Sequence, residues 1–106
     1  MQWSDLPFDY NPRMERDEWV QHCVEVSQLL RQIREQGGLP FTPDEESHFQ
    51  ESLDANELGI AFDLLCWKVE ETGKPISQPF YDLIADAGSR MGCSPSDWEN
   101  LKTLIR

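Results

Sequence analysis

Basic residues are scarce in this sequence of 106 residues. Nine Lys and Arg stand against twenty Asp and Glu, which gives a formal net charge of −11 at pH 7 and an isoelectric point near 4.4. A chain of this charge repels the phosphate backbones of DNA and RNA, so nucleic acid is excluded as the primary partner. A partner with a basic surface is expected instead.

Long apolar segments are also missing. The longest uninterrupted apolar run covers only residues 64–67, whereas a membrane span requires about 20 residues. Residues 1–5 have neither the basic nor the apolar region of a secretory signal. We therefore expect no membrane span and a cytoplasmic protein.

Cysteine and active-site motifs are sparse. Cys23, Cys66 and Cys93 are an odd number without CxxC spacing, and two of them fall in apolar helical stripes, which is typical of reduced core thiols. His22 and His48 have no serine or cysteine partner at a recognisable spacing, and no HExxH motif is present. No glycine-rich phosphate loop occurs either. The sequence thus predicts no catalytic, metal-binding or cofactor-binding residue, and a protein that is not an enzyme.

What the sequence does contain is helical periodicity. Hydrophobic residues make up 39% of the chain and include four Trp and five Phe, enough for one small core and a single domain over residues 1–106. Apolar residues recur at spacings of three and four, and no segment alternates with period two over the length of a strand. The prediction is an all-α bundle of four to five helices with short connections.

Helix start and stop signals divide the chain. Thr42, Pro43 and Glu45 form a predicted capping box, and Ser77 and Ser94 begin further helices that contain proline in the first turn. The second and third helices are predicted as two elements or as one bent helix. The expected elements are an irregular arm over 1–12 whose Trp3, Leu6, Phe8 and Tyr10 pack back onto the domain, and helices over about 13–36, 42–54, 55–71, 77–91 and 94–105.

The apolar stripes of these helices predict the core. The expected core residues are Trp19, Cys23, Val26, Leu30, Ile33, Leu58, Phe62, Leu65, Val69, Phe80, Leu83, Ile84, Ala87, Met91, Trp98, Leu101, Leu104 and Ile105. The third helix also carries a second stripe, Ile60, Leu64 and Trp67, on nearly the opposite side. Either this helix is packed on both sides or covered by the arm, or Trp67 is the anchor of an interface with an acidic rim.

The negative charge is concentrated in one region. Residues 42–71 hold nine acids and a single base, Lys68, whereas residues 72–106 hold four of each. Acids in the first turn of the second helix suit the helix dipole and need no partner. Acids within or at the end of a helix repel one another and are better suited to steering a basic partner. The candidate partner-binding residues are Asp54, Glu57, Asp63, Trp67, Glu70, Glu71, Glu51 and Glu46.

One stretch has the features of a known family. The segment 56–66 ends in Leu65-Cys66 and is followed by Glu70, Glu71 and the helix start Pro75-Ile76-Ser77. With its flanks, residues 54–92, it resembles the small helical immunity proteins of bacterial polymorphic-toxin systems, in particular the Maf-type and contact-dependent growth inhibition immunity proteins. The colicin DNase immunity proteins have a compact acidic loop that this chain lacks.

The resemblance implies a stoichiometric inhibitor that binds the C-terminal domain of a cognate toxin, as a monomer in a 1:1 complex, and blocks its active site or an exosite. The composition agrees with this, because nuclease toxins that bind phosphate backbones are commonly basic. An acidic secretion chaperone or helical adaptor without an inhibitory role is the alternative, since strong negative charge and exposed apolar stripes suit it equally.

Overall fold

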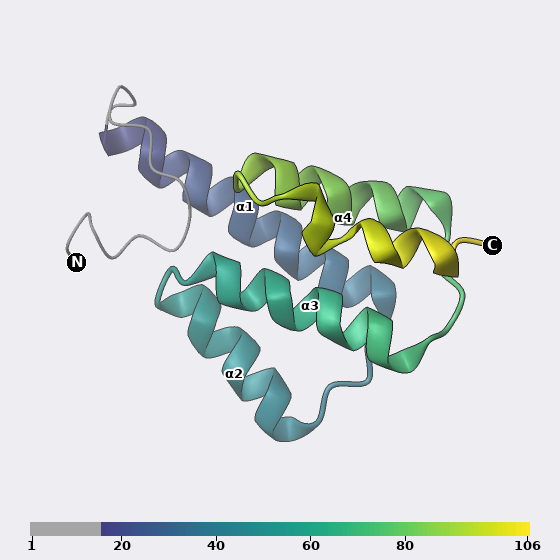
Figure 1. Ribbon diagram of the computed structural model, residues 1–106. Helices are drawn as coiled ribbons and strands as arrows, with labels where there is room; N and C mark the ends of the chain where they lie inside the picture. The colour runs from purple at the N-terminus through teal and green to yellow at the C-terminus, as the bar shows by residue number, and fades with distance from the viewer. Residues whose placement is uncertain (1–15) are drawn as a thin grey trace.

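The apolar stripes fold into four α-helices and a helical C-terminal segment in the computed structural model, which describes residues 16–106 (Figure 1). The elements are α1 (Arg16–Gly37), α2 (Pro43–Asp54), α3 (Leu58–Thr72), α4 (Gln78–Arg90) and the 3₁₀ helices η2 (Pro95–Asp97) and η3 (Glu99–Leu104). The predicted all-α fold is confirmed. The predicted arm over residues 1–12 lies outside the described residues.

Local signals at the helix ends explain these boundaries. The hydroxyl of Thr42 accepts a hydrogen bond from the Glu45 N–H, and the Glu45 carboxylate accepts one from the Thr42 N–H, which completes the predicted capping box. The hydroxyl of Ser77 caps α4 in the same way by accepting from the Phe80 N–H. The first helix stops where Gly38 takes a positive φ of 54°.

The second and third helices are separate elements. Asn56, between them, has a φ of 59° in the left-handed region, where asparagine is among the most tolerated residues. A continuous helix cannot pass through this conformation, so a single bent helix is excluded. The side-chain amide of Asn56 donates a hydrogen bond to Cys23 Sγ at 3.5 Å, which ties the turn to α1.

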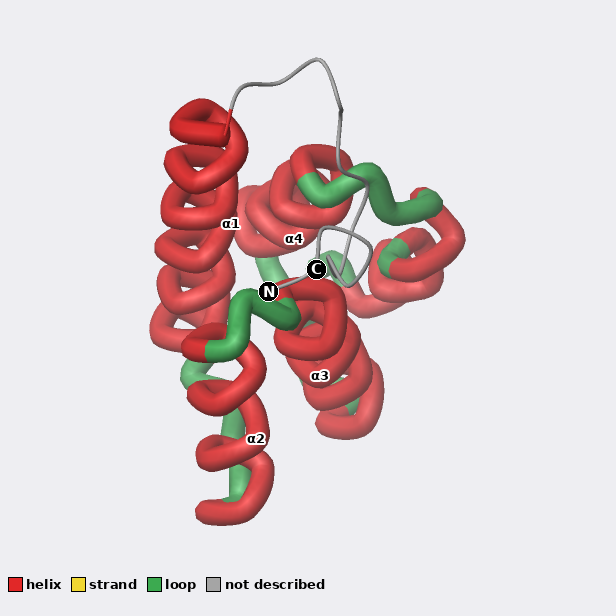
Figure 2. The backbone as a smooth tube through the Cα atoms, turned by 90° about the vertical axis from the view of Figure 1, so that its left-hand side faces the viewer, coloured by secondary structure: helices red, strands yellow, loops and turns green. Residues whose placement is uncertain are grey.

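The core lies between α1, α3 and α4. The first helix runs antiparallel to α4 and also packs on α3, while α2 lies against α3 (Figures 1 and 2). Every core residue predicted in α1 and α3 is buried. In the fourth and last elements the prediction is only partly met, because Leu83, Leu104 and Ile105 are partly buried at the edge of the core.

The C-terminal segment differs from the predicted fifth α-helix. It forms two short 3₁₀ helices, η2 and η3, because Trp98 interrupts the helical backbone with a φ of −133°. This break lets the buried indole reach Gly88 of α4, where any Cβ would clash with it, and the ring of Phe62, whose centroid lies 6.1 Å away. The segment then ends in an isolated parallel bridge between Ile76 and Ile105.

Candidate protein-binding surface

The third helix has two different faces. Its inner face contributes Leu58, Phe62 and Leu65 to the core, and all three are fully buried. On the opposite side, Ile60 is 43% and Trp67 is 47% exposed. Leu64, the third residue of this stripe, is partly buried against the core. The prediction that α3 is packed on both sides is therefore met at Leu64 and fails at Ile60 and Trp67, and the alternative that residues 1–12 cover the second stripe lies outside the described residues.

An ion-pair network holds one edge of this exposed face. Lys68 is only 4% exposed, and its ammonium lies 2.9 Å from Glu45 Oε1 on α2 and 3.6 Å from Glu71 Oε1. Hydrogen bonding to Glu45 raises the pKa of Lys68, and the same bond lowers the pKa of Glu45. The ammonium also lies over the indole of Trp67, 4.9 Å from its centroid. The network thus joins α2 to α3 and fixes one side of Trp67.

Two more of the predicted partner-binding acids are also engaged inside the molecule. Glu46 accepts a 2.7 Å hydrogen bond from Arg34 of α1, and Gln50 donates to its other oxygen. Asp54 lies 4.0 Å from Arg31, although both side chains are exposed. Glu46 and Asp54 thus pair with cations of α1, as Glu71 does with Lys68 of α3. The sequence pattern did not separate these acids from the unpaired ones. Arg34 and Arg31 are distant in the chain from Glu46 and Asp54, and Lys68, the partner of Glu71, was treated only as a single base among nine acids.

The remaining acids of α3 face solvent without a cation. Asp63 and Glu70 are exposed, and neither forms an ion pair within residues 16–106. The pKa of Asp63 is raised, mainly because its carboxyl is partly desolvated and secondly because the negative charge of Asp97 is close. Asp97 is exposed on η2 and likewise has no ion pair in the described chain. These three carboxylates and the exposed apolar residues Ile60 and Trp67 are defined here as the outer face of α3.

Asp97 was missed by the sequence analysis. Its segment, residues 72–106, is neutral as a whole, so no excess of charge marked it. The contact between Phe62 and Trp98 brings it near α3, since Asp63 follows the first of these residues and Asp97 precedes the second. No local signal in the sequence predicts that contact.

Glu51 and Glu57 complete the predicted set. Both are exposed, Glu51 in α2 and Glu57 at the N-cap of α3. No hydrogen bond or ion pair of a described side chain connects them to the outer face. They remain predicted contact residues without a structural partner in this part of the chain.

The chemistry that this surface offers is recognition. Burial, followed by the charges of Asp63 and Asp97, raises the pKa of the Cys66 thiol, and burial also raises that of Cys93, so both thiols are held in their unreactive protonated form. Within residues 16–106, no group of three His, Cys, Asp or Glu residues could hold a metal ion. In the same part of the chain, no helix is long and apolar enough to cross a membrane.

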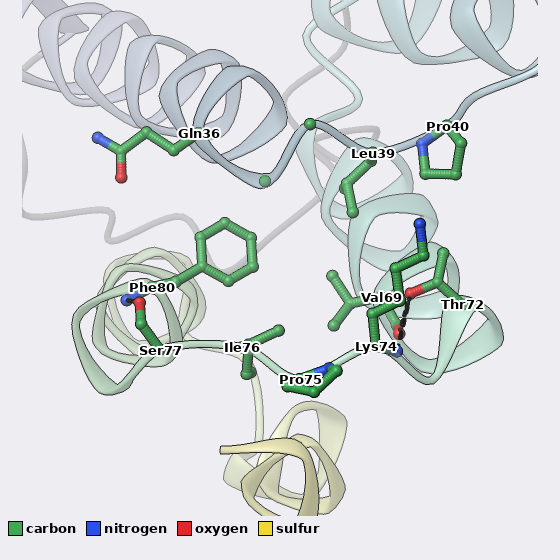
Figure 3. A pocket seen from close by; sticks show the side chains of 12 residues that line it. Gln36, Leu39, Pro40, Val69, Thr72, Lys74, Pro75, Ile76, Ser77 and Phe80 are labelled. Atoms are coloured by element: carbon green, nitrogen blue, oxygen red, sulfur yellow. Dashed lines mark hydrogen bonds between the residues drawn. The ribbon is translucent and has the colours of Figure 1, made fainter. Parts of the chain in front are cut away.

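A separate pocket lies where α1 and α3 end and α4 begins (Figure 3). It has a volume of about 290 Å³, and Phe80, Leu39 and Val69 contribute apolar side chains to it. Lys74 is its one charged lining residue. The volume is at the lower limit for small-molecule sites. Gln36, Thr72 and Ser77 supply further polar side chains, and none of the predicted partner-binding residues lines the pocket.

Comparisons with known proteins identify no relative of this chain. No protein-family model matches the sequence, no curated protein matches it, and no solved structure matches the fold. What this chain binds must therefore be inferred from its own residues.

Proposed function

We propose that this chain is a cytoplasmic immunity protein that binds and neutralises the C-terminal domain of a cognate bacterial toxin, a basic nuclease. The observation that carries the proposal is the outer face of α3, where a half-exposed tryptophan lies among carboxylates without ion-pair partners in the described chain. A central aromatic side chain with a charged rim is the composition of a tight protein interface.

The electrostatics of the chain suit an inhibitor of a nuclease. A net charge of −11 attracts a basic domain at long range and increases the rate of association. An acidic protein also competes with nucleic acid for the cations with which a nuclease binds phosphate groups. A 1:1 complex is the simplest arrangement for one such face on each molecule.

Co-expression tests this function. A candidate toxin, taken as the C-terminal domain of a large protein encoded next to the gene of this chain, is expressed in a bacterial host with and without the chain, and survivors are counted. We expect the domain to kill alone, the chain to restore growth, and the two to co-purify. The matched control is the double variant Glu18→Gln/Glu35→Gln, which removes two exposed charges of α1, outside the outer face of α3, and should still rescue.

Two results would reject the proposal for that pair. One is a domain that is harmless alone, and the other is a domain that still kills although the chain is present and soluble. In either case co-purification without neutralisation would favour the alternative function, an acidic secretion chaperone or adaptor.

A further inference from the structure

The outer face of α3 has a regular spacing along the helix. Ile60 and Trp67 are seven residues apart, and so are Asp63 and Glu70. Seven residues are about two turns, or about 10 Å along the axis, so each pair lies on the same side of the helix. The face therefore presents an apolar line and an acidic line that run side by side along α3.

The apolar line is held in place before any partner arrives. Lys68 lies over the indole of Trp67, and Glu45 and Glu71 hold that ammonium through two ion pairs. About half of the Trp67 side chain remains exposed. A fixed aromatic side chain loses little conformational entropy on binding, which favours its use as an anchor.

Charge decides what kind of molecule covers this face. A second copy of the chain would bring the same unpaired carboxylates against one another, and both molecules carry −11. Anionic lipids and nucleic acids are repelled by the same charges. A polypeptide with Lys or Arg beside apolar residues is complementary to both lines.

The backbone decides the conformation of that polypeptide. An extended segment gains main-chain hydrogen bonds by adding to the edge of a sheet, and a helix such as α3 offers no such edge because its peptide groups are bonded within the helix. A second helix, in contrast, repeats its own side chains every seven residues, so that they can pack against Ile60 and Trp67, which have the same spacing on α3. We propose that the outer face of α3 binds one basic amphipathic helix of the partner, with its apolar residues on Ile60 and Trp67 and its cations on Asp63, Glu70 and Asp97. Only the source of this helix, the toxin domain, rests on the proposed function.

A peptide titration tests the proposal without any toxin. The probe is a synthetic helix of about 20 residues, long enough to be helical, with Leu and Lys each repeated at heptad positions. The control peptide has the same composition in scrambled order, which abolishes the amphipathic pattern. Binding to the full chain is measured by isothermal titration calorimetry at low and at high salt.

The expected pattern is local. Trp67→Ala should weaken binding by about tenfold, as loss of an interface anchor does. Asp63→Asn/Asp97→Asn should weaken it by about threefold at low salt and by less at high salt. The matched control, Glu18→Gln/Glu35→Gln on α1, removes the same number of charges and should change binding by less than about twofold. Ile60→Ser is a second apolar variant in case Trp67→Ala is destabilised.

Three results would overturn the proposal: no binding of the heptad peptide, equal binding of the scrambled peptide, or equal losses in the outer-face and control variants. Failure here leaves the immunity function standing if co-expression still rescues growth. Failure of rescue, with localised peptide binding, leaves the helix-binding face standing. The two tests therefore fail independently.

Discussion

Two neighbouring regions of this molecule both contain clustered acids but differ in what surrounds these acids. At the seam of α1, α2 and α3, Glu45, Glu46 and Glu71 each meet a Lys or Arg side chain within 3.6 Å. On the outer face of α3, Asp63 and Glu70 meet none in the part of the chain that the structure describes. The density of charge along a sequence therefore does not distinguish acids that stabilise the fold through ion pairs from acids that are available to bind a partner.

The two faces of α3 should differ most in stability. Phe62→Ala removes a fully buried ring from the core and should lower the free energy of unfolding by about 3–5 kcal/mol. Trp67→Ala removes a half-exposed ring and should cost less than about 1 kcal/mol. Urea denaturation of both variants measures the difference. Similar losses would mean that Trp67 belongs to the core.

The next largest effect concerns the contact that brings Asp97 to the outer face. In Gly88→Ala the new methyl group would clash with the indole of Trp98, and overpacking of this kind costs about 1–3 kcal/mol. Displacement of Trp98 should also move Asp97 away from Asp63. We therefore expect both a lower urea midpoint and weaker binding of the basic peptide. Unchanged stability would show that the C-terminal segment does not depend on this contact.

The paired acids should stabilise the fold in a pH-dependent manner. The pKa of Glu45 is lower in the folded chain than its ordinary value of 4.5, so its ionised form stabilises the fold above that pH. This contribution is lost as the pH falls through the folded-state pKa. Glu45→Gln should accordingly lower the thermal midpoint at pH 7, and the difference from the unmodified protein should shrink below about pH 4. A constant difference across this range would exclude the ion pair as its cause.

The unpaired acids should show the opposite sign and the smallest effect. The pKa of Asp63 is raised above its ordinary value of 3.8, so its ionised form destabilises the fold at neutral pH. Asp63→Asn should increase stability at pH 7 by less than about 0.5 kcal/mol, because the group is exposed and screened by solvent. The gain should vanish near pH 3, where the carboxyl is protonated in both states. A loss of stability at pH 7 would place Asp63 with the paired acids.

Much of the fold follows from local signals, and the surface does so only in part. The capping box at Thr42 and the stripe from Trp19 to Ile33 act within a few residues of themselves, so the sequence predicts them well. The 3₁₀ form of the C-terminal segment depends on tertiary packing and was not predicted, whereas the break between the second and third helices was one of two open alternatives. The exposed position of Trp67 was one of two open alternatives.

Long-range pairing explains the rest of the difference at the surface. Arg34 and Glu46 are twelve residues apart, and Lys68 and Glu45 are twenty-three apart. No local pattern connects the residues of these two pairs, so the sequence could not separate Glu46 from Asp63 and Glu70. Asp97 entered the outer face for the same reason, through the contact of Phe62 with Trp98. Glu71 is a different case, because its partner Lys68 lies three residues away on the same helix, a spacing that the count of charges overlooked.

The unequal burial of the tryptophans makes the outer face directly observable. Trp19 and Trp98 are buried, whereas Trp67 is half exposed. Once Trp3 is replaced by Phe, a water-soluble quencher such as acrylamide should reach one indole among the described residues far more readily than the others. Quenching of the Trp67 emission then reports whether the outer face is open or covered, without a label or a substitution on that face.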